Sequence, residues 1–164
     1  MSTSVSWRAR LEERGFPLPE VVAPIAAYRP AVRAGDVVYT SGQLPFVAGV
    51  LPVTGRVGDT VSVEDARRLA AQCAANALAA AVWAADGRDV VRIIKVVGFV
   101  ASAPDFAQHS AVIDGASELR GEAFGSAGHH ARSAVGVAAL PLGSPVEVEL
   151  IVGLAPASED GRRP

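Results

Sequence analysis

The run from His129 to Pro141 holds one arginine, Arg132, among small and apolar residues. Its alternating pattern predicts a strand, and a turn rich in proline and glycine separates it from a second apolar strand at 146–154. The chain therefore places a permanent cation in a sheet that we expect to be largely buried. A guanidinium in such a place needs an anion, either a protein carboxylate or a ligand, because an unpaired buried charge is very costly.

The alternation also predicts which residues share a face. Arg132 shares its face with small residues at 134, 136 and 138, whereas Glu147 and Glu149 leave the apolar face of the second strand together. A turn centred near 142 and 143 would pair the two strands as an antiparallel hairpin with Arg132 on the glutamate face, unless the register slips by one residue. Glu147 then faces Ala138, roughly 20 Å from Arg132 along the strand. If both residues serve one site, different subunits should supply them.

Length and composition predict one domain with a substantial core, since half of the 164 residues are apolar. The net charge of −2 and the single lysine, Lys95, give no basic field for nucleic acid or an anionic membrane. The single cysteine, Cys73, excludes an intramolecular disulfide and a cysteine-rich metal site. The first 14 residues carry charges unlike those of a signal peptide, and the apolar stretch at 74–85 is too short to span a bilayer. We expect a cytoplasmic protein.

Three regions are predicted along the chain: an N-terminal extension at 1–25 with a short helix and a proline-rich connector, a main domain at 26–156, and a flexible tail at 157–164. The main domain is predicted to contain, in order, strands at 28–33 and 37–41, an irregular loop at 42–59, a helix at 66–85, a strand at 90–102, a helix at 108–124 and the two final strands. This order predicts an α+β sandwich, a mixed β-sheet with two helices on one face.

Two helices cannot cover both faces of such a sheet, although its strands carry apolar residues on both. We therefore expect self-association to bury the second face, in a symmetric oligomer with clefts between its subunits. Ligand sites favour such clefts.

Several short motifs occur in a specific order between Tyr28 and Leu154. They are Tyr28 before the first strand, Thr40 to Pro45 after the second, Phe106 after Pro104 and Asp105, Ala131 to Ser133, Leu140 with Pro141, and Val146 to Glu149. In this combination the chain resembles the RidA/YjgF family of small imine deaminases, formerly described as endoribonuclease L-PSP. The resemblance implies a chorismate-mutase-like fold and a homotrimer with three sites at subunit interfaces. It also implies hydrolysis of 2-imino acids, such as 2-iminopropanoate and 2-iminobutanoate, to 2-keto acids and ammonia without a metal or organic cofactor.

The same resemblance assigns roles to the residues that match. Arg132 matches the arginine that grips the substrate carboxylate, and Glu147 matches the glutamate near the reactive water. Ser41 and Gly42 match a loop that contributes hydrogen bonds, and Tyr28 matches a tyrosine of the site. These five residues are the predicted catalytic and substrate-binding set.

Two further positions depart from the family pattern and are counted among the substrate-binding residues. Ala134 stands where typical deaminases have cysteine, and Asp114 lies in the region where they often carry asparagine. Asp114 is near the start of a helix, so a capping role and a role in the site both stay open.

The predicted roles suit the chemistry of a 2-imino acid. The planar fork of arginine binds a carboxylate at two points and fixes the neighbouring C=N carbon. A water held by Glu147 would then add to that carbon, with proton transfers to nitrogen before ammonia leaves. Arg132 would otherwise be an ion-pair partner of Glu147 or Glu149, and the trimer would otherwise bind small carboxylates without catalysis. A ribonuclease is disfavoured, because the chain is acidic and lacks a basic patch interleaved with aromatic residues.

Overall fold

The computed structural model describes residues 6–21 and 28–157. Its elements, in order, are α1 (Trp7–Glu13), β1 (Ala31–Ala34), β2 (Val37–Thr40), α2 (Val63–Ala84), β3 (Val90–Ala101), α3 (His109–Phe124), β4 (Ala131–Val137) and β5 (Val146–Leu154). Short 3₁₀ turns at 125–128 and 141–143 precede the last two strands. The helix predicted in the N-terminal extension is present, whereas residues 1–5 and 22–25 of that extension and residues 158–164 of the predicted tail lie outside the described residues.

The start and the packing of α2 follow from its sequence. The hydroxyl of Ser62 accepts a hydrogen bond from the backbone N–H of Asp65 at 3.1 Å, and acidic residues occupy the first turn, where the helix dipole favours them. Gly115 of α3 lets the two helices approach closely, because a Cβ added there would collide with the backbone of Arg67 in α2. In the described parts of the chain, no helix is both long and apolar enough to cross a membrane.

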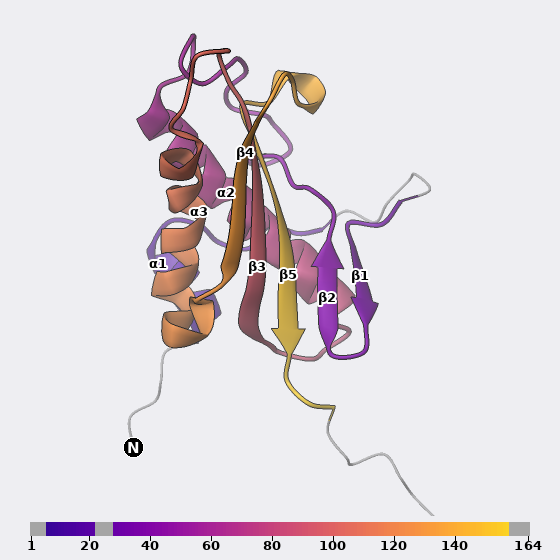
Figure 1. Ribbon diagram of the computed structural model, residues 1–164. Coiled ribbons are helices and arrows are strands. Elements are labelled where there is room, and N and C mark those ends of the chain that lie inside the picture. Colours follow the sequence, from indigo (N-terminus) through magenta and orange to yellow (C-terminus); the bar gives the residue numbers. More distant parts are fainter. Residues whose placement is uncertain (1–5, 22–27, 158–164) are drawn as a thin grey trace, which may run out of the picture.

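The strands form one mixed sheet in the order β1-β2-β5-β3-β4 (Figure 1). β3 and β4 are parallel and are joined through α3, and the other neighbouring pairs are antiparallel. β1 and β4 are therefore the two edges of the sheet. The predicted α+β class with a mixed sheet is confirmed.

The predicted hairpin between the last two strands is wrong. β4 pairs with β3, and β5 lies on the other side of β3, between β3 and β2. Glu147 pairs with Phe99 instead of facing Ala138, and Arg132 pairs with Val96. The reason is the crossover: α3 returns the chain so that β4 runs parallel to β3, and the next segment carries β5 past β3 to a position with a neighbour on each side.

The helices lie on one face of the sheet and leave the other face open (Figure 1). Buried residues such as Ile93, Val96 and Leu150 point to the helices. On the open face Val32, Tyr39 and Val135 are substantially exposed; half-buried neighbours there are Val97, Phe99, Glu147, Glu149 and Ile151. The prediction of helices on one face is confirmed, and burial of the open face by self-association stays a prediction.

Candidate functional site

Arg132 lies near the start of the edge strand β4 and points to the helix-covered side of the sheet. Its pairing partner on β3 is the buried Val96, and directly paired residues share a face. The prediction that Arg132 shares a face with the glutamates is therefore wrong. The long side chain reaches α3, and 26% of it is exposed. A guanidinium covered to this extent still needs a compensating anion.

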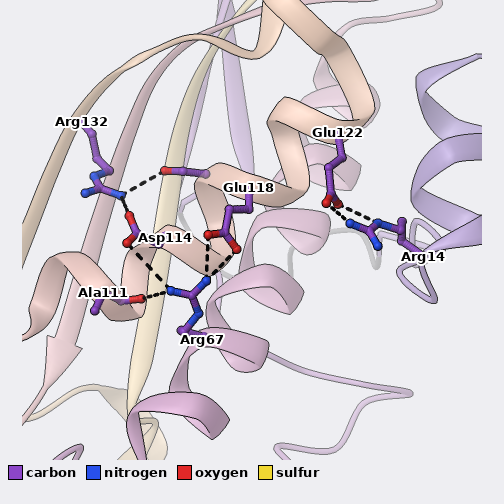
Figure 2. A network of polar contacts seen from close by, with 8 residues as sticks. Arg14, Arg67, Ala111, Asp114, Glu118, Glu122 and Arg132 are labelled. Atoms are coloured by element: carbon purple, nitrogen blue, oxygen red, sulfur yellow. Dashed lines mark hydrogen bonds and ion pairs between the residues drawn. The ribbon is translucent and has the colours of Figure 1, made fainter.

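Asp114 of α3 is that anion. Arg132 Nη1 donates to Asp114 Oδ1 at 2.6 Å and to Ser117 Oγ at 3.3 Å. Asp114 Oδ2 also lies 3.9 Å from Nη1 of Arg67, and Arg67 Nη2 donates to the Glu118 carboxylate at 2.7 Å. Figure 2 shows Asp114 between the two arginines. The network therefore balances two cations with two carboxylates. Arg132 pairs with Asp114 of α3 and not with a glutamate of the sheet.

The guanidinium of Arg132 retains an unused edge. Both of its partners bind Nη1, and no described residue accepts a hydrogen bond from Nη2 or Nε. These two nitrogens carry parallel donors of the kind that bind a carboxylate at two points. Ala134, two residues further along the same face of β4, is half-buried and packs against the hydrophobic core.

Glu147 lies near the start of β5 and points to the open face. Gln43 exchanges backbone hydrogen bonds with Val148, with N···O distances of 2.9 and 3.1 Å, and these bonds hold the loop after β2 against β5. A Cβ added to Gly42 would collide with the Glu147 carboxylate, so any larger residue would force this side chain to move from its present position. The structure thus brings together two residues that the sequence predicts for one site.

Two effects raise the pKa of Glu147. The larger is partial burial, which disfavours the charged carboxylate, and the second is the negative charge of Glu149 on the same face. In the described parts of the chain, no cation pairs with Glu147. A carboxyl group with a raised pKa is better suited to accept and return a proton than an ordinary surface glutamate.

Ser41 begins the loop after β2, and Tyr28 lies just before β1. The Ser41 hydroxyl donates to the Arg29 carbonyl at 2.7 Å, and its backbone N–H donates to the Pro30 carbonyl at 2.9 Å. Both donors of Ser41 are therefore already used, whereas no described residue accepts from the N–H of Gly42. Tyr28 is 68% exposed just before β1, so its ring is not part of the core.

The predicted residues thus fall into two groups. We call them the Arg half-site (Arg132, Ala134, Asp114) and the Glu half-site (Tyr28, Ser41, Gly42, Glu147). Glu147 and Val135 both pair with Phe99, and Arg132 precedes Val135 by three residues on the other side of β3. This offset corresponds to about 14 Å between the backbones of Arg132 and Glu147, with the side chains on opposite faces.

The two half-sites of one chain therefore do not form a single site. Two hollows of about 230 and 800 Å³ open between the helices and the N-terminal connector, and neither is lined by Arg132 or Glu147.

Within residues 6–21 and 28–157, no group of three histidine, cysteine, aspartate or glutamate side chains is placed to hold a metal ion.

Sequence reasoning missed Ser117 and Arg67 as partners in the Arg half-site. Ser117 could have been found from its spacing, because residues three apart on a helix share a face and Asp114 precedes it by three. Arg67 gave no such signal. It lies outside the buried stripe of α2, and its contact with Asp114 depends on how α2 packs against α3.

A mixed five-stranded sheet with one parallel crossover, two long helices on one face and an open apolar face defines a class of small α+β domains. Within that class, the sequence profile of the family described as Endoribonuclease L-PSP matches residues 19–154. The chain belongs to this family, which is the RidA/YjgF family. The family predicted from the motifs is confirmed.

Similar proteins span the length of the domain. Protein TCP17 of Trypanosoma cruzi is 39% identical over 160 residues, which cover 94% of this chain and 99% of that protein. The crystal structure of Atu1372 from Agrobacterium tumefaciens, described as having unknown function, is 45% identical with a TM-score of 0.84 and covers 91% of this chain and 92% of that chain. The YjgF gene product of E. coli is 29% identical with a TM-score of 0.60, over 82% of this chain and 93% of that chain.

Proposed function

We propose that this protein is a cytoplasmic homotrimer that hydrolyses small 2-imino acids, of the 2-iminopropanoate and 2-iminobutanoate type, to 2-keto acids and ammonia. The observation that carries the proposal is the pair of incomplete half-sites. One half offers an unused guanidinium edge, and the other offers a carboxyl group with a raised pKa beside a backbone donor that no described residue uses. Membership of the RidA/YjgF family supports the assignment.

Assembly through the open face would complete the site. The apolar side chains there, among them Val135 and Tyr39, favour burial against another subunit. In a closed ring each subunit presents one surface to the preceding subunit and another to the next. The Arg half-site lies at the edge strand β4, and that edge of one subunit would meet the Glu half-site on the open face of its neighbour, in a cleft between them.

Arg132 fixes the substrate. The carboxylate of the 2-imino acid binds the Nη2 and Nε donors, and the C=N carbon attached to it is held in one position. Gly42 contributes its backbone N–H, Tyr28 borders the cleft, and Ala134 leaves the wall next to Arg132 small.

Glu147 acts as the general base toward the attacking water. Its carboxylate accepts a proton as the water oxygen bonds to the C=N carbon, and it passes that proton to the imine nitrogen as the C=N double bond becomes single. In the resulting carbinolamine, the hydroxyl proton moves through the same carboxylate to the amine nitrogen, the oxygen forms C=O, and the C–N bond breaks to release NH3. One water is consumed for each keto acid and ammonia released, and no metal or organic cofactor enters this balance.

The test is ammonia release from freshly generated 2-iminobutanoate. We expect wild type to exceed the uncatalysed rate and Arg132→Ala to lose about 100-fold, since a bidentate charged contact is removed. Arg68→Ala is the matched control, because Arg68 is an exposed α2 arginine that pairs with Asp65. Sedimentation equilibrium measures the number of subunits.

A wild-type rate equal to the uncatalysed rate would contradict the proposal. If 2-oxobutanoate nevertheless raised the melting temperature of wild type and not that of Arg132→Ala, the protein would be a carboxylate-binding module without this activity.

A further inference from the structure

Asp114 presents to Arg132 the same chemical group that a 2-imino or 2-keto acid would present. The distance of 2.6 Å between Asp114 Oδ1 and Arg132 Nη1 is that of a short, charge-assisted hydrogen bond. The pair is not sealed inside the protein, because 26% of the Arg132 side chain and 41% of the Asp114 side chain are exposed. A dissolved carboxylate can therefore reach the same guanidinium.

The charges around Arg132 leave little attraction for another anion. Arg67, the second cation of the network, donates to the Glu118 carboxylate through Nη2 and to the Ala111 carbonyl through Nη1 (Figure 2). Its distance of 3.9 Å from Asp114 Oδ2 is too long for a hydrogen bond. Asp114 is therefore tied chiefly to Arg132, and a ligand carboxylate would arrive as a third anion in a network that is already neutral.

We propose that Asp114 is an intramolecular competitor for the ligand's carboxylate at Arg132 and that it sets the affinity of the site for monocarboxylates. The inference rests on the proposed function in one respect, namely that Arg132 binds a carboxylate. A ligand either displaces Asp114 from Nη1 or binds Nη2 and Nε while Asp114 repels it from a few ångströms away. In both cases the negative charge of Asp114 weakens binding.

A purely positioning role for Asp114 predicts the opposite. If Asp114 only held the guanidinium in place, its replacement would loosen Arg132 and weaken the binding of carboxylates. Ser117 separates the two roles, because its hydroxyl binds the same nitrogen without charge. Glu118 is the second control, since it supplies a carboxylate to the same network but binds Arg67.

The experiment measures binding by titration calorimetry, so it does not depend on turnover. The probes are 2-oxobutanoate and its uncharged counterpart 2-oxobutanamide, applied to wild type, Asp114→Asn, Ser117→Ala, Glu118→Gln and Arg132→Ala. Asparagine keeps a hydrogen-bond acceptor for Arg132 while it removes the charge. Asp114→Ser is a second neutral variant in case Asp114→Asn fails to fold, which circular dichroism would show.

We expect Asp114→Asn to bind 2-oxobutanoate about tenfold more tightly than wild type, from the Coulomb energy of one partly solvated charge a few ångströms away. Ser117→Ala should not tighten binding, Glu118→Gln should tighten it less than twofold, and 2-oxobutanamide should show no gain in any variant. Arg132-dependent binding that is unchanged or weaker in both Asp114 variants would overturn the inference and leave the proposed function standing. Binding of 2-oxobutanoate that does not depend on Arg132 would overturn both.

Discussion

The two half-sites differ in whether their ionisable groups have partners of opposite charge. In the Arg half-site the guanidinium has a carboxylate partner, and the charges around it balance. In the Glu half-site Glu147 has no cation partner among the described residues, and Glu149 adds a second negative charge nearby. One chain thus pairs the guanidinium of Arg132 with a carboxylate and leaves the Glu147 carboxyl without a cation partner among the described residues. An unused donor edge on one side and a proton-accepting group on the other would make the two surfaces complementary.

Glu147→Gln tests whether one half-site binds the substrate while the other transfers the proton. In the proposed mechanism Glu147 accepts the proton of water, so Glu147→Gln should lower turnover of 2-iminobutanoate about 100-fold or more. The affinity for 2-oxobutanoate, which the proposal assigns to Arg132, should change by less than about threefold. Steady-state rates of ammonia release and calorimetric titration measure the two quantities on the same preparation.

Glu149→Gln is the matched control for that substitution. Glu149 follows on the same face of β5 and contributes to the raised pKa of Glu147. Its replacement should lower turnover far less than Glu147→Gln does. Equal losses in the two variants would mean that the negative charge of this surface matters and that no single carboxyl transfers the proton.

A smaller effect is expected from the backbone that approaches Glu147. The methyl group of Gly42→Ala would occupy the place of the carboxylate and push it aside, and turnover should fall about tenfold. Because the Glu147 side chain is only half-buried, it can swing away, so the free energy of unfolding should change by less than about 1 kcal/mol. Urea denaturation checks the second value.

A double variant tests whether the loss passes through Glu147. In Gly42→Ala/Glu147→Gln the alanine should cost little beyond the glutamine alone, because both changes remove one function. Gly153→Ala serves as the control on β5, where an added Cβ would make only ordinary contacts at 3.7 Å. Additive losses in the double variant would show that Gly42 acts independently of the carboxyl.

Much of the fold could be predicted because its signals are local. Ser62 begins α2 as its cap, and the alternation along β5 separates the glutamates from the apolar face correctly. The pairing of the last strands could not be predicted in this way. A short connection rich in proline and glycine fits a hairpin as well as a crossing to another position, and the choice depends on the path of α3 across the sheet.

The site residues also fall into a part that could be predicted from sequence motifs and a part that could not. Gly42 and Glu147 were predicted for one site by the family motifs, and the loop after β2 does meet β5. The contact between Arg132 and Asp114 follows from two features that a linear pattern does not contain, namely the parallel register of β4 on β3 and the rotation of α3 about its axis. The alternation shows that an arginine in this run needs an anion, but it does not identify which carboxylate supplies it.

The smallest expected effect concerns stability and tests the uncompensated charge itself. The raised pKa means that the folded chain holds the Glu147 proton more tightly than the unfolded chain, whose value is near 4.5. Ionisation therefore opposes folding once the pH rises above that value, and the cost becomes constant above the folded pKa. Glu147→Gln should match wild type near pH 4 and be slightly more stable at pH 7, by less than about 1 kcal/mol because water screens a half-exposed group. Urea midpoints at the two pH values measure this, and Glu118→Gln, which removes a carboxylate bound by Arg67, should not gain stability at pH 7. A loss of stability at pH 7 in Glu147→Gln would mean that this carboxylate is compensated after all, and the contrast between the half-sites would fail at its electrostatic basis.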